Sequence, residues 1–277
     1  MKVIDSHQHF WEYDPVRDSW ISDDMAVLKR DFMPIDLAVE LKANKIDGCI
    51  AVQADQSDKE TMFLLQQAEK NDLVKGVVGW VDLQAVDIEN QLKNYSKYKK
   101  LLGFRHIVQG EPDPDFMLGT KFQNGLAQLH RYGFTYDILV YPSQLQAAIE
   151  TVKRHPQQKF VIDHMAKPAI KAGEIEEWKA CMKVLGSYAN VWCKVSGLVT
   201  EADWSSWKYE DLVSYLDVVV LAFGMDRVMY GSDWPVCLLA AEYSEVRGIV
   251  DRYFNKYSKT EKGKFFGLNA MEFYGID

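Results

Sequence analysis

Short apolar segments of strand-forming residues alternate with helical patterns eight times along the chain, and this alternation constrains the fold most strongly. Most of the segments are apolar throughout, as expected for strands buried on both faces. Strands separated by helices run parallel, because each helix carries the chain back across the sheet. The predicted strands are Lys2–His7, Gly48–Ala54, Val74–Leu83, Leu102–Val108, Phe134–Tyr141, Lys159–His164, Asn190–Val195 and Arg227–Tyr230.

The segments between the strands carry helix signals. Residues 57–60, Ser-Asp-Lys-Glu, form a capping box, in which side-chain oxygens satisfy free N–H groups at a helix start. Leu145, Ala148, Ile149 and Val152 show the spacing of a helix packed on a sheet. Eight such units predict a closed (β/α)8 TIM barrel, whereas six or seven would favour an open, doubly wound sheet.

Length and composition agree with one globular domain over residues 1–277, because no linker or low-complexity segment divides the chain. The net charge is −8 and no block of Lys or Arg stands out, which argues against a nucleic-acid partner.

The longest apolar run, 218–223, is too short to span a membrane. Scattered cysteines and the lack of a signal peptide predict a cytoplasmic protein. The oligomeric state stays open.

In such barrels the chemistry takes place at the carboxyl ends of the strands. His7 and His9 end the first strand and point the same way, so they can hold a divalent cation or polarise a substrate oxygen together. Further polar residues end later strands: Arg105 and His106 the fourth, His164 the sixth, Lys194 the seventh and Asp233 the eighth.

Each strand-end residue also has a structural interpretation. A single histidine often only packs, Lys194 can extend its amine to solvent, and Asp233 can cap the next helix. However, four of the six histidines fall at predicted strand ends, together with a lysine and an aspartate. This combination favours a functional site.

Several motifs resemble the amidohydrolase superfamily. The opening segment 4–11, with its His-x-His, resembles the first strand of that superfamily. The segments 163–168 (Asp-His-Met-Ala-Lys-Pro), 194–198 (Lys-Val-Ser-Gly-Leu) and 230–236 (Tyr-Gly-Ser-Asp-Trp-Pro-Val) resemble its sugar-lactonase branch. The match runs in order from the first strand to the last. The resemblance implies an amidohydrolase-type barrel that opens the ring of a sugar-acid lactone.

The chain departs from the two-metal members of this superfamily. Those proteins bridge their metals with a carboxylated lysine on the fourth strand and add a histidine from the fifth. Here the fourth strand carries Arg105 and His106, and the fifth has no histidine. His7, His9, His164 and Asp233 can together hold one Zn2+. Because the resemblance implies that the same residues also work without a metal, we expect no required cofactor, with a single Zn2+ as the alternative.

The same residues suggest a mechanism for lactone hydrolysis. Asp233 is ionised at neutral pH and can accept a proton from water as it attacks the lactone carbonyl. The charge that builds on the carbonyl oxygen can be stabilised by the three histidines, with Arg105 or Lys194 nearby. No Gly-x-Ser-x-Gly motif indicates a serine hydrolase.

The expected substrate is a small sugar-acid lactone. Aromatic and amide side chains near the strand ends suit a polyhydroxylated ring, although each can instead pack a loop onto the barrel. We expect substrate contacts from Trp11, Gln53, Trp80, His106, Tyr141 and Trp234. A dicarboxylate lactone would require several arginines in the cleft, and few lie near strand ends, which favours a neutral lactone.

Two other functions remain open from the sequence. A metal-dependent decarboxylase of the related amidohydrolase branch would use the same histidines and aspartate with an obligatory metal. A non-catalytic barrel could bind a sugar acid as a sensor. The second alternative leaves unexplained why a base stands opposite a set of oxyanion donors.

Overall fold

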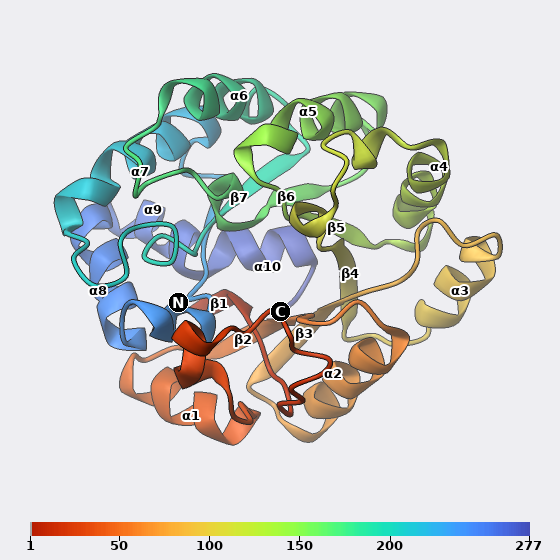
Figure 1. Cartoon of the computed structure of the whole chain (residues 1–277), viewed down its shortest axis with the longest axis horizontal. Helices are drawn as coiled ribbons and strands as arrows, with labels where there is room; N and C mark the ends of the chain where they lie inside the picture. Colours follow the sequence, from red (N-terminus) through yellow and green to blue (C-terminus); the bar gives the residue numbers. More distant parts are fainter. Residues whose placement is uncertain (1) are drawn as a thin grey trace.

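A computed structural model of the chain describes residues 2–277. Within these residues eight parallel strands follow one another in chain order around one sheet (Figure 1). The predicted (β/α)8 barrel is therefore confirmed. The strands are β1 (Ile4–Gln8), β2 (Gly48–Val52), β3 (Val74–Gly79), β4 (Leu101–His106), β5 (Thr135–Ile138), β6 (Phe160–Ile162), β7 (Val191–Val195) and β8 (Val228–Tyr230).

The main helices surround this sheet as an outer ring, and α10 crosses one end of the barrel (Figure 1). The predicted capping box is present at α2, where Ser57 Oγ accepts a hydrogen bond from the Glu60 amide. The helices are α1 (Pro34–Ala43), α2 (Asp58–Lys70), α3 (Ile88–Tyr95), α4 (Thr120–Leu129), α5 (Leu145–Arg154), α6 (Glu176–Gly186), α7 (Tyr209–Phe223), α8 (Tyr243–Phe254), α9 (Lys259–Gly263) and α10 (Asn269–Tyr274). Each helix in residues 2–277 is too short or too polar to cross a bilayer.

Several strands are shorter than the apolar runs predicted. The third ends at Gly79 instead of Leu83, and the fifth ends at Ile138 instead of Tyr141. Strand pairing stops at these two residues, and the remaining residues of each apolar run enter the loops at the barrel mouth. An apolar run in the sequence indicates which residues are buried. Residues stay buried beyond the last hydrogen bond between the strands, so the run is longer than the strand.

The barrel closes between β1 and the segment after β8. The His9 amide donates to the Trp234 carbonyl oxygen at 2.7 Å, and the Asp233 amide donates to the His7 carbonyl oxygen at 2.9 Å. The register between Asp5 and Gln8 is irregular, so β1 has one extra residue relative to β2. This closure places His7, His9 and Asp233 side by side.

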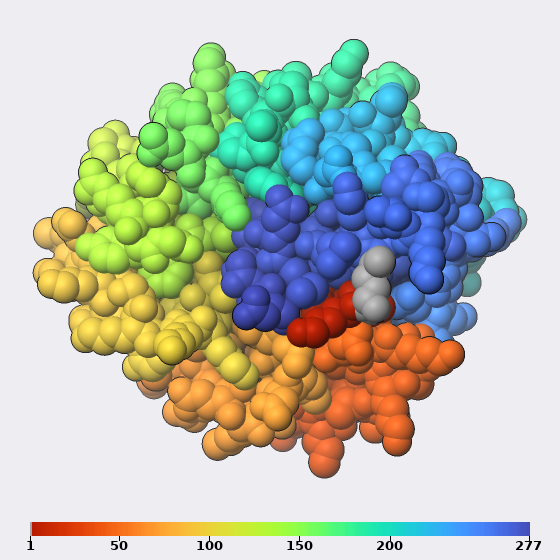
Figure 2. Space-filling model, turned by 180° about the vertical axis from the view of Figure 1, so that it is seen from behind, coloured from red at the N-terminus to blue at the C-terminus, as the bar shows by residue number. Residues whose placement is uncertain are grey.

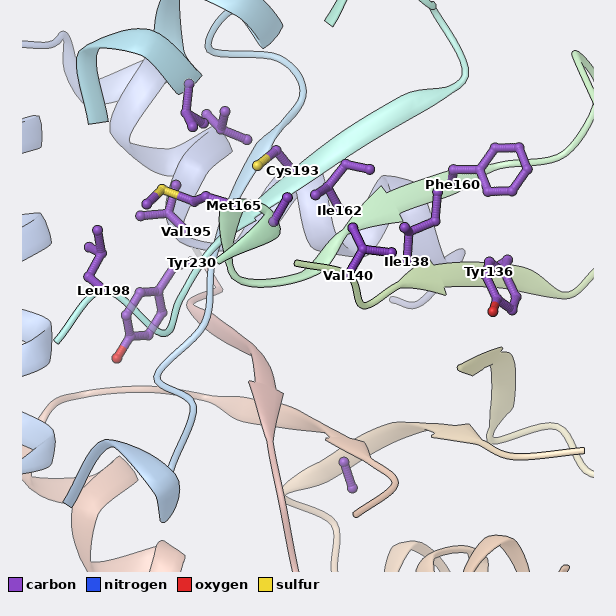
Figure 3. Packing of buried hydrophobic residues seen from close by; sticks show 14 of the residues in the cluster. Tyr136, Ile138, Val140, Phe160, Ile162, Met165, Cys193, Val195, Leu198 and Tyr230 are labelled. Atoms are coloured by element: carbon purple, nitrogen blue, oxygen red, sulfur yellow. The ribbon is translucent and has the colours of Figure 1, made fainter. Parts of the chain in front are cut away.

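Alternating residues of the strands face either the helices or the barrel interior. Figure 3 shows Ile138, Ile162 and Cys193, which are register partners on β5, β6 and β7, packed in the layer beneath the helices. Burial raises the pKa of the Cys193 thiol, so this residue is a packing residue rather than a thiolate nucleophile. The cysteines of residues 2–277 are free thiols.

The barrel interior is layered along its axis. The layer next to α10 is apolar and contains Ile4, Ile50, Val52, Val78, Val161, Trp192 and Met229. Phe273 and Tyr274 of α10 pack against it, and Figure 2 shows this C-terminal segment covering the face opposite to Figure 1. Charged residues form the next layer towards the other end, where the strand termini surround a cavity.

Candidate active site

A cavity of about 510 Å3 lies at the carboxyl ends of the strands. Its volume is within the usual range for small-molecule sites. Its floor contains polar side chains and its walls are largely aromatic and aliphatic. The lining comprises His9, Trp11, Trp20, Met25, Ala54, Arg105, Ile107, Gln109, Gly110, Leu139, Tyr141, His164, Lys167, Thr200, Glu201, Trp204, Asp233, Val236 and Leu239.

Three histidines and Asp233 meet at the base of this cavity: His9, His164 and Asp233 line it, and His7 is buried against His9. The Nε2 atoms of His7 and His9 lie 3.2 Å apart, and His9 Nε2 lies 3.4 Å from Asp233 Oδ1. His164 Nδ1 lies 3.8 Å from Asp233 Oδ2. Residues from β1, the loop after β6 and the loop after β8 therefore converge, as the strand-end pattern predicts.

The hydrogen bonds around the two β1 histidines identify their tautomers. His9 Nδ1 lies 2.8 Å from the carbonyl oxygen of Val52, so Nδ1 carries a proton and donates it. Arg105 Nη1, which can only donate, lies 3.3 Å from His7 Nε2. Two ring nitrogens and the Asp233 carboxylate oxygen thus face one another, an arrangement that suits a shared proton or a bound metal ion.

The spacing of these atoms fits one divalent metal ion. Tetrahedral ligands at about 2.0–2.1 Å from zinc lie about 3.3 Å from one another. The His7–His9 and His9–Asp233 contacts, at 3.2 and 3.4 Å, match that separation. Other pairs are wider: His7 Nε2 and Asp233 Oδ1 lie 4.0 Å apart, and ligand atoms of His7, His164 and Asp233 all lie within 4.8 Å of one another. The residues present are therefore a suitable donor set for a single ion.

His164 is positioned by an unusual backbone. Four consecutive residues, His164 to Lys167, have positive φ angles of 49°, 52°, 57° and 47°. Each left-handed residue costs about 1–2 kcal/mol, so the surrounding packing has to impose the turn. The Trp178 indole donates to the Met165 carbonyl oxygen at 2.7 Å, and Met165 is itself buried. The turn directs both His164 and Lys167 into the cavity.

Gly197 provides the space that His164 occupies. A Cβ atom at this position would lie 2.8 Å from His164 Nδ1, and Gly197 has a φ of 66°. Ser196 Oγ lies 2.9 Å from the same ring nitrogen. The Ser-Gly pair at the end of β7 thus orients the His164 ring.

A layer of paired charges lies directly beneath the histidines. Lys194 Nζ lies 2.5 Å from Asp137 Oδ2, 3.0 Å from Asp163 Oδ1 and 3.2 Å from His7 Nδ1. Arg105 Nη1 donates to Asp163 Oδ2 at 3.0 Å. Two cations thus balance two carboxylates, and all four are buried. Breaking such a buried network is costly, so it holds His7 in one position.

The placement of Lys194 and His7 changes the roles expected from the sequence. Both side chains are fully buried and neither lines the cavity. Lys194 therefore does not reach a substrate oxyanion. Its amine forms ion pairs with Asp137 and Asp163 in the charged layer beneath the cavity. Arg105 does line the cavity, with Nη2 bound to Gln53.

Electrostatics keep the floor of the cavity in a defined protonation state. Burial lowers the pKa of His7 and of His164 well below the ordinary value, so both rings are neutral at pH 7. Burial pushes the pKa of Asp233 upward, but the surrounding groups, His164, the hydrogen bond with His9 and the Lys167 cation, outweigh this effect and lower the pKa below its ordinary value. Asp233 is therefore ionised at neutral pH.

A sequence profile of the amidohydrolase family matches residues 4–276. The chain belongs to the amidohydrolase family. His9 of the first-strand His-x-His and Asp233, which carry the resemblance in the sequence, line the floor of the cavity, and His7 contacts His9.

Two curated relatives and two crystal structures align over nearly the whole length of this amidohydrolase. The L-fucono-1,5-lactonase of Burkholderia multivorans is 39% identical, with 99% of this chain and 96% of the relative covered. The L-fucono-1,5-lactonase of Burkholderia ambifaria is 32% identical with the same coverage. Crystal structures of a Burkholderia multivorans amidohydrolase, one with bound HEPES and one with bound zinc, are 38% identical with a TM-score of 0.96 and cover 100% of both chains.

A single Zn2+ is consistent with the site of this amidohydrolase. The donor set of His7, His164 and Asp233 is present, and a crystal structure of high overall similarity contains zinc. The fifth strand has no histidine, and its single acid, Asp137, is bound to Lys194.

The six predicted substrate-binding residues divide into two groups. Trp11 and Tyr141 line the cavity. The other four do not: Gln53 is buried against Arg105, and Trp234 is buried between Phe10 and Phe32.

Trp80, directly after β3, and His106, at the end of β4, lie together on the outer side of the sheet. The Trp80 indole donates to His106 Nδ1 at 3.3 Å, and His106 Nε2 lies 2.7 Å from Glu111 Oε1. Because Arg105 faces the barrel interior, its neighbour His106 faces outward, as alternation along a strand requires. Direct substrate contact is therefore not supported for this pair.

Other lining residues were not singled out from the sequence as site residues. Trp20 and Trp204 are aromatic residues of long loops, and Lys167 is part of the Asp-His-x-x-Lys-Pro motif. Glu201 lies in an irregular segment after β7 and carries no sequence signal. Lys167 Nζ and Glu201 Oε1 form an ion pair at 2.6 Å on the cavity wall.

Proposed function

We propose that this chain hydrolyses the ring ester of a sugar-acid lactone, with Asp233 as the general base. The observation that carries the proposal is one ionised carboxylate facing a group of histidines and Arg105 across a cavity of substrate size. The two Burkholderia L-fucono-1,5-lactonases, aligned over nearly the full chain, support the same activity. An L-rhamnono-gamma-lactonase of Scheffersomyces stipitis, 22% identical over 75% of the chain, supports the same kind of substrate.

In the proposed reaction a water molecule attacks the lactone carbonyl carbon while Asp233 accepts one of its protons. The carbonyl oxygen becomes an oxyanion that His164 and Arg105, both on the cavity lining, can stabilise. The tetrahedral intermediate then collapses, the ring C–O bond breaks, and the proton on Asp233 passes to the leaving oxygen. The product is an open-chain hydroxy acid.

His7 and Lys194 do not contact the substrate and act through the residues that line the cavity. His7 Nδ1 contacts Lys194 and Asp163, while its Nε2 contacts His9 and Arg105. These contacts orient the groups that reach the cavity. When a divalent ion is bound, His7, His9, His164 and Asp233 would hold it, and it would supply Lewis-acid polarisation of the carbonyl.

The walls of the cavity support a neutral, polyhydroxylated substrate. Trp11, Trp20, Tyr141 and Trp204 provide flat apolar surfaces. Arg105 is neutralised by Asp163, so the cavity offers no cluster of free arginines for a dicarboxylate within residues 2–277. We also propose a cytoplasmic location, in agreement with the free cysteine thiols.

A panel of lactones with a pH-indicator readout tests this proposal. Hydrolysis releases one proton per turnover, and we expect turnover of L-fucono-1,5-lactone or another six-carbon or 6-deoxy sugar lactone. The decarboxylase alternative instead predicts CO2 release from an aromatic or unsaturated acid. No turnover of any lactone, together with CO2 release, would refute the proposal. Activity after dialysis against a strong chelator, followed by addition of Zn2+, measures separately whether a metal is needed.

A further inference from the structure

The wall of the cavity carries an ion pair that the proposed reaction does not use. Lys167 Nζ donates to Glu201 Oε1 at 2.6 Å, with side-chain exposures of 14% and 17%. Lys167 comes from the left-handed turn after β6, and Glu201 from the loop after β7. The Lys171 amide donates to the Glu201 carbonyl oxygen at 3.1 Å, which ties the two loops together. Both side chains line the cavity.

This pair retains unused hydrogen-bonding capacity. An ammonium group has three donors, and within residues 2–277 the Lys167 amine has one hydrogen-bond acceptor, Glu201 Oε1. Likewise, in the described chain the second carboxylate oxygen of Glu201 has no hydrogen-bond donor. The pair therefore presents to the cavity both donors and an acceptor, held at a fixed separation.

The pair is also electrically neutral as a unit. Burial lowers the pKa of Lys167, but attraction to Glu201 and Asp233 outweighs it and raises the pKa above the ordinary value, so the amine stays protonated. Its charge is cancelled by the adjacent carboxylate. A neutral pair with donors and acceptors does not select an anion, but it does suit a hydroxyl group, which donates and accepts at once.

We propose that Lys167 and Glu201 form a hydroxyl-recognition pair that makes the cavity selective for polyhydroxylated, uncharged lactones. One ring hydroxyl donates to the free oxygen of Glu201, and the same or a neighbouring hydroxyl accepts from Lys167. The Tyr141 ring, whose centroid lies 5.8 Å from Lys167 Nζ, provides an apolar surface beside the pair. This inference rests on the proposed lactonase function and assigns its substrate selectivity to two residues.

The test compares two lactones of the same ring size: L-fucono-1,5-lactone, and δ-valerolactone, which has no hydroxyl groups. The measured quantity is the ratio of their kcat/KM values. A hydrogen bond to a charged group is strong enough that its loss changes affinity by about tenfold or more. We therefore expect Lys167→Met to lower this ratio about tenfold.

Glu201→Gln provides a second, independent variant of nearly the same shape. It removes the carboxylate charge, so we expect it to lower the same ratio. It also leaves the Lys167 cation uncompensated, so L-fuconate, an anion, should inhibit this variant more strongly than the wild type. Stronger inhibition by an anion is a result that a merely structural role of Glu201 would not produce.

Lys171→Met is the matched control, because Lys171 also forms an ion pair, with Asp203 at 3.1 Å, but does not line the cavity. We expect wild-type rates on both lactones. If Lys167→Met and Glu201→Gln lower both rates equally, or leave the ratio unchanged, the inference is refuted while the lactonase proposal stands. If another sugar lactone of the panel is preferred, it replaces L-fucono-1,5-lactone in this ratio. If the wild type opens no lactone of the panel, the proposed function fails, and the inference with it.

Discussion

Two lysine–carboxylate pairs of nearly equal length lie in different parts of this barrel. Lys194 contacts Asp137 at 2.5 Å and Lys167 contacts Glu201 at 2.6 Å. The first pair is formed by strands and is fully buried, whereas the second is formed by loops and faces the cavity. The same ionic contact can therefore position a catalytic floor in one place and present polar atoms to a ligand in the other.

The surroundings of the two pairs explain this difference. Lys194 has a second carboxylate, Asp163, at 3.0 Å in addition to Asp137, so its amine is held between two buried carboxylates. Tyr274 of α10 donates to Asp137 at 2.8 Å, which links the far end of the barrel to the charged layer. At the wall, the amine of Lys167 has one hydrogen bond in the described chain, to Glu201. An ion pair whose hydrogen-bonding groups are already used keeps the cavity floor rigid, whereas an ion pair with unused donors and acceptors can bind a ligand.

The largest expected effect comes from breaking the buried pair. Lys194→Met leaves two carboxylates with one fewer cation in a dry interior, which should cost about 3–5 kcal/mol of unfolding free energy. The matched Lys167→Met should cost only about 1 kcal/mol, because its partner can be solvated. Urea denaturation of both variants measures the difference. Equal losses would contradict the contrast between the two pairs.

Arg105 lies at the boundary between the two regions, because it belongs to the charged layer and also lines the cavity. Arg105→Lys cannot bind Asp163 and Gln53 with one planar fork, so the histidine cluster loses a preorganised donor. We expect kcat/KM on the preferred lactone to fall about 10²–10³-fold. Arg252→Lys, at an exposed position on α8, is the control and should keep the wild-type value. A fall of less than threefold for Arg105→Lys would exclude an oxyanion role.

Glu60 extends this comparison to a buried carboxyl group that, among residues 2–277, forms no ion pair with a lysine or an arginine. Burial raises its pKa to about 7, against the hydrogen bond from the Ala54 amide. The folded state therefore binds more protons than the unfolded state between pH 4.5 and 7, and stability falls as the pH rises through that window. Glu60→Gln should raise the unfolding free energy by about 2–3 kcal/mol at pH 8 and leave it unchanged at pH 4.

Denaturation curves at the two pH values measure this effect. Glu69→Gln, on the exposed side of the same helix α2, is the control and should follow the wild type at both pH values. If Glu60→Gln is no more stable than wild type at pH 8, Glu60 is stabilised by a cation despite its burial.

Much of the fold and of the cavity floor could be predicted from the sequence. Parallel strands buried on both faces leave an apolar run, and their carboxyl ends share one face of the barrel. His7, His9, His164 and Asp233 lie at such ends, so their convergence follows from topology. The alternation along β4 also explains why Arg105 faces inward and His106 outward.

The wall of the cavity could not be predicted in this way. Lys167 reaches the cavity through four consecutive left-handed residues that include no glycine, so no local preference marks the turn. The position of Glu201 depends on the path of an irregular loop, which the sequence does not indicate. Trp80 and Trp234 lie beside site residues in sequence, yet side-chain packing in the loops turns them away from the cavity. Asp137 is a single acidic residue in an otherwise apolar strand. Such a residue indicates a buried carboxylate that needs a cation partner, and this signal in the sequence was missed.

The central claim, that Asp233 activates water at the floor of the cavity, is tested most directly by the turnover of Asp233→Asn on L-fucono-1,5-lactone. Asparagine tolerates the positive φ of 59° at this position and keeps the shape of the side chain, so the fold should be preserved. Loss of a general base predicts that kcat falls about 10²–10⁴-fold. Turnover close to that of the wild type would contradict the account.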